Sequence, residues 1–254
     1  MNRVLTRSLR VLGGGTAAAA LLGLTYIAGT WYRYGRTRGN RQTDPLLDRF
    51  LPIYEVGERH QTIVRAPASI TYEAARELDL QESGLIRAIF AGRELLMRAK
   101  PARPQTAGPF LQQVLALGWG ILADEPGHEL VLGAVTQPWK ANVSFRSLPP
   151  EEFTAFHEPG YAKIAWTLAV EPVEGGSSVF RTETRVATTD PSSRARFRRY
   201  WSVFSPGILL IRWETLRLVK RNAERRADRQ ALQLSSEEVS GDLHIIEQRQ
   251  PAPR

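Results

Sequence analysis

The sequence of 254 residues contains no cysteine. This absence excludes a disulfide framework, a zinc site built from thiolates and a cysteine nucleophile. Histidine is also scarce. The four histidines are His60, His128, His157 and His244, and no two of them have the i, i+4 or His-x-His spacing of a metal site. The sequence therefore predicts no metal and no cofactor.

Motifs for nucleotide or acyl chemistry are missing as well. Gly13-Gly14-Gly15 is not followed by the lysine and serine of a phosphate loop, and no nucleophile elbow is present. The paired carboxylates Glu151-Glu152 and Glu237-Glu238 are adjacent in sequence, so they need not face each other. His157, in a loop before a predicted strand, is the alternative as a general base. We predict no catalytic residue, which makes an enzyme the less favoured function.

Acidic residues are absent from positions 1–43, which hold seven arginines. The net charge of +8 is therefore a local property of the chain. Residues 44–180 hold 12 basic and 17 acidic groups, whereas residues 181–229 hold 13 basic and 5 acidic groups. No zinc-finger spacing, glycine-aromatic strand motif or clear helix-turn-helix accompanies these basic segments. We therefore predict that nucleic acid is not a partner.

One long stretch of the chain lacks charge altogether. The 22 residues from Val11 to Tyr32 are uncharged. As a helix they would extend about 33 Å, which is enough to cross the hydrocarbon core of a bilayer. Aromatic residues gather at the C-terminal end and arginines flank both ends, as is typical of membrane interfaces. We predict a single membrane-spanning helix over residues 11–32, within an anchor and basic tether formed by residues 1–43.

Two other interpretations of this stretch stay open. A cleaved signal peptide would suit the basic start, but Ile27-Ala28-Gly29 matches a cleavage site poorly and arginines follow soon after it. The third interpretation is a hydrophobic helix buried in the domain. Three arginines precede the span and four follow it, so its orientation is nearly balanced. The denser cluster after the span slightly favours a cell-membrane protein whose domain is cytoplasmic.

Residues 44–229 are expected to form one folded domain. Asp44-Pro45 predicts a helical turn over residues 46–51 that docks on this domain. Alternating side chains over residues 55–66 predict a strand, and apolar residues at helical spacing over residues 68–99 predict two helices. From residue 115 the period changes to two. We expect strands over residues 115–123, 129–136, 141–146, 152–156, 161–171 and 178–188.

A long amphipathic helix is predicted to close the domain. Asp190-Pro191 supplies a capping residue and a proline at the first helical position, and apolar residues follow at helical spacing. Ser205-Pro206-Gly207 predicts a kink or a restart in this helix. Residues 230–254 contain few apolar groups and predict a disordered tail.

This order of elements indicates an α+β fold, in which a curved antiparallel sheet is covered by the long terminal helix. The layout resembles the helix-grip fold of the SRPBCC superfamily, which includes START lipid-transfer domains, birch-pollen-allergen-like proteins and polyketide cyclases. The resemblance covers residues 53–228, and the segments that carry it look like those of bacterial members of unassigned function. It is carried by Arg65-Ala66-Pro67, by residues 118–139, and by Phe180–Val186 followed by Phe197–Trp201. It implies an apolar cavity between the sheet and the helix that holds a lipid, a sterol, a polyketide or another hydrophobic molecule.

The candidate cavity residues are apolar groups on the predicted strands and terminal helix, with two threonines as polar points. They are Trp119, Phe145, Trp166, Phe180, Thr182, Thr184, Trp201, Phe204 and Ile208. The alternative is that these residues simply form the core. His60 shares a strand face with Val56 and Val64, so it is interpreted as a core histidine or as one that enters the cavity. The basic residues from Arg194 to Arg226 form either a solvated helix face or a contact with anionic lipid headgroups.

We therefore predict a membrane-anchored module that binds a hydrophobic small molecule or lipid. The first alternative is a cyclase- or dehydratase-type enzyme that uses the same cavity. The second is a protein with a filled core whose surface serves the assembly of other membrane proteins. The ligand and the oligomeric state stay open.

Overall fold

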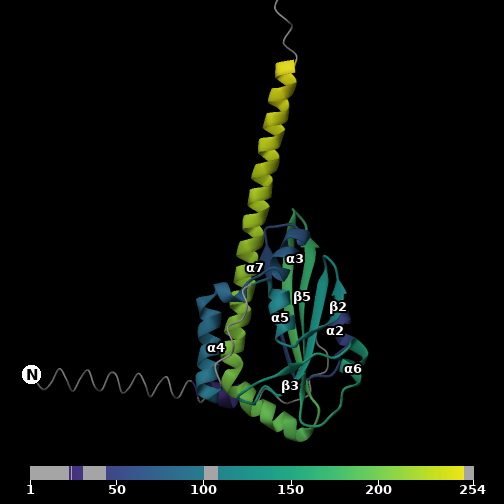
Figure 1. Ribbon diagram of the computed structural model, residues 1–254, viewed down its shortest axis with the longest axis vertical. Helices are drawn as coiled ribbons and strands as arrows, with labels where there is room; N and C mark the ends of the chain where they lie inside the picture. Colours follow the sequence, from purple (N-terminus) through teal and green to yellow (C-terminus); the bar gives the residue numbers. More distant parts are fainter. Residues whose placement is uncertain (1–22, 24, 31–43, 100–107, 249–254) are drawn as a thin grey trace, which may run out of the picture.

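The chain folds around one curved antiparallel sheet (Figure 1). The computed structural model describes residues 23, 25–30, 44–99 and 108–248. The strands are β1 (Val56–Val64), β2 (Gly120–Glu125), β3 (Glu129–Thr136), β4 (Phe145–Arg146), β5 (Ala162–Val173) and β6 (Ser177–Thr188). They pair in the order β1-β6-β5-β3-β2, with β4 on β3. The fold class is therefore α+β, as predicted.

The helices form a layer on each face of this sheet. They are α2 (Pro45–Asp48), α3 (Ala68–Arg76), α4 (Gly84–Met97), α5 (Phe110–Ala116), α6 (Pro150–Ala155) and α7 (Pro191–Gln248), with a 3-10 turn at Leu80–Glu82. Figure 1 shows α3, α5 and α7 on one side of the sheet and α2 and α6 on the other. We call these sides the α7 face and the α2 face. Because both are covered, β3 is buried along its whole length.

The strands predicted from strict alternation are confirmed for β1, β3, β5 and β6. The hairpin between β5 and β6 turns over residues 174–176, where Gly175 and Gly176 have positive φ angles of 73° and 70° that glycine adopts readily. The two helices expected within residues 68–99 are confirmed as α3 and α4. Ser83 caps α4, and its hydroxyl accepts a hydrogen bond from the Ile86 N–H.

Three predicted strands are wrong in whole or in part. Residues 115–123 were expected to be one strand, but α5 occupies residues 110–116 and β2 begins at Gly120, because Gly118 turns the chain with a φ of 99°. Residues 152–155 belong to α6 and Phe156 follows its end; the start of this helix combines Pro150 with acidic residues in the first turn. The strand expected over residues 141–146 is only the two residues of β4.

The predicted terminal helix is confirmed as α7. The Asp190 side chain accepts hydrogen bonds from the N–H and the hydroxyl of Ser193, and these bonds hold the pKa of this carboxyl well below its usual range. The helix is continuous through Pro206, so no restart occurs, although Figure 1 shows a change of direction in its green part. The helix also continues to Gln248, where a disordered tail was expected from residue 230. The scarcity of apolar residues after residue 230 limits the packing of this segment, but it does not prevent the segment from forming a helix.

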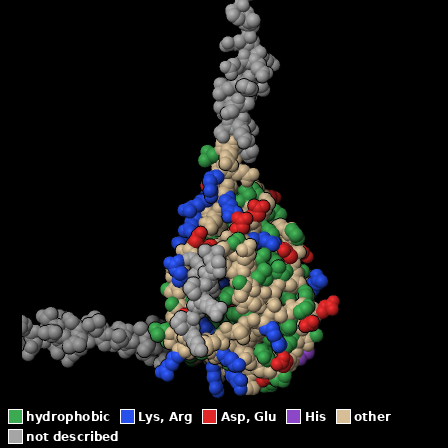
Figure 2. Space-filling view, viewed as in Figure 1, with side chains coloured by type: hydrophobic (Ala, Val, Ile, Leu, Met, Phe, Trp, Pro, Cys, Tyr) green, Lys and Arg blue, Asp and Glu red, His purple; other side chains and the backbone are tan. Residues whose placement is uncertain are grey.

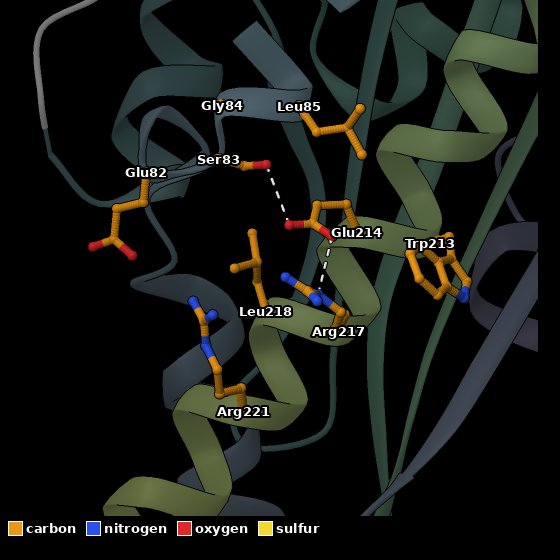
Figure 3. Close-up of a pocket in the computed structure, with 9 residues that line it drawn as sticks. All are labelled: Glu82, Ser83, Gly84, Leu85, Trp213, Glu214, Arg217, Leu218 and Arg221. Atoms are coloured by element: carbon orange, nitrogen blue, oxygen red, sulfur yellow. Dashed lines mark hydrogen bonds and ion pairs between the residues drawn. The ribbon is translucent and has the colours of Figure 1, made fainter. Parts of the chain in front are cut away.

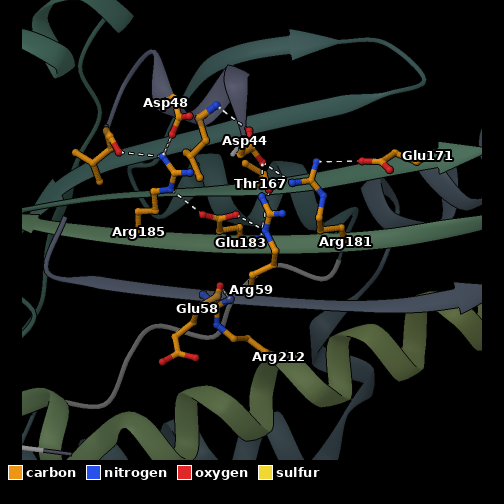
Figure 4. A network of polar contacts seen from close by, with 12 residues as sticks. Asp44, Asp48, Glu58, Arg59, Thr167, Glu171, Arg181, Glu183, Arg185 and Arg212 are labelled. Atoms are coloured by element: carbon orange, nitrogen blue, oxygen red, sulfur yellow. Dashed lines mark hydrogen bonds and ion pairs between the residues drawn. The ribbon is translucent and has the colours of Figure 1, made fainter. Parts of the chain in front are cut away.

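A buried ion-pair network fastens α2 to the α2 face (Figure 4). Arg181, Glu183 and Arg185 occupy alternate positions of β6, so they point to the same face. Arg181 donates a hydrogen bond to Asp44 at 2.7 Å, and Arg185 donates to Glu183 at 2.7 Å and to Asp48. The Arg185 side chain is completely buried, and these carboxylates compensate for its lost hydration. The turn predicted at Asp44-Pro45 is thus present and docked.

The predicted membrane span lies mostly outside the described residues. Of residues 11–32, only Gly23 and residues 25–30 are described, and these are helical. Among the helices in the described part of the chain, none combines the length and the apolar character that crossing a bilayer requires. Membrane anchoring therefore stays a prediction.

Candidate ligand-binding site

The hydrophobic core on the α7 face is divided into two packed clusters. The first surrounds Phe180 of β6 and includes Leu168 of β5 and Val219 of α7. The second surrounds Trp201 of α7 and includes Val186 of β6. Phe180 and Val186 lie six positions apart on β6, so the two clusters lie toward opposite ends of this strand. Between the two cluster centres, Trp119 and Trp166 pack against the first cluster, and Ile164 and Ile208 pack against the second.

Side chains in the middle of the α7 face are only partly buried. Ile164 and Trp166 lie on β5, which is the central strand, and both are partly exposed. Thr184, opposite Trp166 in register, is also partly exposed, as is Ile208 on α7. A residue on the central strand of a covered sheet is normally sealed from solvent. Helix α7 therefore does not seal the centre of the sheet completely from solvent, and we call the region around these side chains the central space.

Aromatic rings form one wall of this central space. The ring centroids of Trp119 and Trp166 are 6.0 Å apart in an edge-to-face arrangement, and those of Trp119 and Phe145 are 5.0 Å apart. Phe110 of α5 contacts Trp166 from the other side at 5.4 Å. Gly118 permits this arrangement, because a Cβ there would lie 2.3 Å from the carbonyl oxygen of Phe145. The connection between α5 and β2 thus determines the position of Trp119.

Polar groups form the opposite wall, where β1 faces α7. Glu58 pairs in register with Thr184, and His60 pairs with Thr182. Figure 4 shows Glu58 and Arg212 in the layer between β1 and α7, and Arg212 donates a hydrogen bond to the Glu58 carbonyl at 3.1 Å. Burial lowers the pKa of His60 and Arg212 lowers it further, whereas Glu58 opposes the shift. His60 Nδ1 is buried without a hydrogen-bond partner among the described residues.

The nine predicted cavity residues fall into three groups. Those around the central space are Trp119, Phe145, Trp166, Thr184 and Ile208. Those buried on the α7 face at relative exposures of 5% or less are Phe180, Thr182 and Trp201. The last, Phe204, lines a separate hollow of about 350 Å³ with Tyr200 and Met97. Their role in binding a ligand stays a prediction.

Two polar members of this region were not among the residues predicted from the sequence. Glu58 lies on the same alternating face of β1 as His60, and that spacing could have identified it. Arg212 was counted with the basic residues of the terminal helix and was not placed in the cavity. Its position is 154 residues from Glu58 along the chain, so only the packing of α7 against β1 reveals the contact. Within the described residues, no group of three or more histidine and acidic side chains could hold a metal ion.

A second hollow of about 450 Å³ lies outside the sheet, between the start of α4 and α7 (Figure 3). Leu85 and Trp213 contribute its apolar surface, and Arg217 and Arg221 its basic surface. Glu214 accepts a hydrogen bond from the Ser83 hydroxyl and forms an ion pair with Arg217 at 3.1 Å. This hollow and the one at Phe204 both lie along the contact between α4 and α7.

Comparisons with known proteins give distant structural likenesses only. No family model matches the chain, and no curated protein matches it. Among solved structures, CalU16 from Micromonospora echinospora is 14% identical over 75% of this chain and 94% of its own, with a TM-score of 0.26. Ara h 8.0201 is 11% identical over 66% and 97%, with a TM-score of 0.25.

Two further structures are similarly distant. The hypothetical protein jhp0584 from Helicobacter pylori is 8% identical over 76% of this chain and 99% of its own, with a TM-score of 0.33. The ZhuI aromatase/cyclase from Streptomyces sp. R1128 is 15% identical over 67% and 94%, with a TM-score of 0.22. All four TM-scores are below 0.5, so these likenesses carry no argument about the present chain.

Proposed function

We propose that this protein is a membrane-anchored module that binds a hydrophobic small molecule or lipid between its sheet and α7. The observation that carries the proposal is the divided core. One cluster is centred on Phe180 and the other on Trp201, and the central strand carries Ile164 and Trp166, which pack against these clusters but stay partly exposed. An apolar molecule in this space would remove that surface from water.

The two walls suit an amphipathic ligand. Trp119, Trp166 and Phe145 offer an apolar surface, while His60 and Arg212 lie on the opposite side. A few polar groups in an apolar cavity typically fix the orientation of a ligand. We propose that the hydrocarbon part of the ligand contacts the aromatic wall and that its polar end accepts or donates hydrogen bonds near His60.

The test fills the space from one side. Thr184→Phe adds a ring opposite Trp166, and Thr184→Val removes the hydroxyl at nearly constant volume. Thr154→Phe is the matched control, because Thr154 is an exposed residue of α6. The full chain and each variant would be purified in an amphipathic polymer. Binding would be measured by titration with a fluorescent fatty acid, and copurified molecules would be identified by native mass spectrometry.

We expect Thr184→Phe to weaken binding of the probe at least about tenfold, since the ring occupies the space of the ligand. Thr154→Phe and Thr184→Val should bind as the unaltered chain does. Nonspecific partitioning of the probe into residues 11–32 would be the same in every variant, so it cancels in the comparison. If Thr184→Phe is folded by circular dichroism and binds the probe unchanged, the ligand does not occupy this space.

A further inference from the structure

Helix α4 packs antiparallel along α7 on the side away from the strands. Leu85, near the start of α4, lines one hollow with Trp213, and Met97, at its end, lines the other with Phe204. At the midpoint the two helices approach closely, because a Cβ at Gly207 would lie 3.0 Å from Ile89. The two helices therefore present one joint outer surface.

This surface is unusually apolar. Large hydrophobic side chains on it have relative exposures between 41% and 80%; they are Leu85, Leu95 and Leu96 of α4 with Val203, Leu210 and Trp213 of α7. We call these six residues the outer face. The α7 members follow at intervals of seven and three residues, so they share one helix stripe. That stripe is distinct from the one carrying Trp201 and Ile208, which packs toward the sheet.

Arginines stand at both ends of the outer face. Arg196 and Arg199 line the hollow beside Met97. Arg217 and Arg221 line the one beside Trp213, together with Glu82 and with Glu214, which pairs with Arg217. Figure 2 shows Lys and Arg side chains gathered at the lower end and the left edge of the molecule, where α4 and the start of α7 lie. Apolar residues framed by arginines are typical of surfaces that lie in the headgroup region of a bilayer, where the long basic side chains reach the phosphates.

One residue of the uncharged N-terminal segment contacts the same helix. Tyr26 belongs to the stretch predicted to cross the membrane, and its hydroxyl oxygen lies 3.2 Å from Ser205 Oγ of α7. The outer face residue Val203 is two positions from Ser205. A helix that enters a bilayer at this point would bring the α4–α7 pair to the bilayer surface.

We infer that the outer face docks on an anionic lipid bilayer, and this inference rests on the anchoring part of the proposed function. Charge favours the bilayer over a second copy of the chain. A symmetric pair of outer faces would bring arginines of both copies together, whereas anionic headgroups attract them. Docking also places the α7 side of the protein, and with it the ligand space, next to the lipid.

The test uses the absence of cysteine. A single cysteine can be labelled without competition in Leu96→Cys, Trp213→Cys and Val173→Cys, and the last is the control, at an exposed site where β5 ends. Each full-chain variant would carry a bimane fluorophore. The vesicles would contain equal amounts of phosphatidylcholine and phosphatidylglycerol, with a nitroxide-labelled lipid as quencher.

We expect lipid quenching at positions 96 and 213 to exceed that at position 173 by at least about twofold, and to fall in phosphatidylcholine vesicles or at high salt. Cosedimentation of the full chain with equal quenching at all three positions would overturn the docking face while leaving the anchoring intact. Failure to cosediment at all would overturn the anchoring itself. Disulfide-linked dimers of Leu96→Cys without vesicles would assign the face to a second copy and contradict the inference.

Discussion

Glu129 gives the protein a pH-dependent stability that can be measured directly. Glu129 is the first residue of β3 and is only 3% exposed. Its carboxyl oxygen Oε1 has no hydrogen-bond partner among the described residues. Burial raises its pKa to about 8, the nearby Asp44 carboxylate adds to the increase, and Arg181 opposes it. Glu129→Gln replaces this acid by a neutral group of the same shape.

The magnitude follows from linkage between protonation and folding. The unfolded chain releases the Glu129 proton near 4.5, the ordinary pKa of a glutamate, whereas the folded chain keeps it up to about pH 8. Between these values the folded state loses stability as pH rises, because only the unfolded state gains the charged form. At about 1.4 kcal/mol per unit of pKa, the loss reaches about 3 kcal/mol at neutral pH and about 5 kcal/mol above the folded pKa.

The assay is urea unfolding of the full chain and of Glu129→Gln between about pH 4 and about pH 9. The two should have similar stability at the acidic end, and the variant should become progressively more stable than the unaltered chain toward pH 8. Glu171→Gln is the matched control, because Glu171 forms an ion pair with Arg181, whose charge also acts on Glu129, but the Glu171 side chain is 54% exposed. A stability difference for Glu129→Gln that does not change with pH would refute the reasoning.

Three further predictions concern stability. Glu183→Ala should lower the free energy of unfolding by about 3 to 5 kcal/mol in urea titration, since it leaves two buried or half-buried guanidinium groups without their shared carboxylate; an unchanged midpoint would contradict this. Gly118→Ala should cost more than about 2 kcal/mol, because its Cβ would meet the Phe145 carbonyl at a positive φ, and calorimetry would check it. Asp190→Ala should speed amide hydrogen exchange in the first turn of α7, and equal rates would argue against the cap.

The elements that the sequence predicted well are those whose pattern reports directly on burial. Along β5 and β6 the alternating positions from Ile164 and from Phe180 face α7, so periodicity located both strands. The start of α7 was predictable because a cap and a proline act locally. Where local signals competed, the prediction failed: Phe110 and Val114, four residues apart, bury one side of α5, although Leu115 to Ala123 looked like a strand.

The polar part of the structure could not be predicted in the same way. Alternation places Arg181, Glu183 and Arg185 on one face, but it does not show that Asp44 and Asp48 would cover them. Those contacts span 137 residues, and they depend on where α2 docks. The outer face was likewise hidden, because its α4 and α7 residues become one surface only when the two helices lie side by side.

One helix, α7, has a role on both of its sides. Ile208 packs toward the sheet, whereas Leu210, two positions later, is exposed on the outer face. Both belong to one continuous helix. The two sides of one α-helix cannot move independently of each other. A tilt of α7 that moved Leu210 and Trp213 deeper into their surroundings would also change the distance between α7 and Trp166. Docking of the outer face and the size of the proposed ligand space would therefore change together.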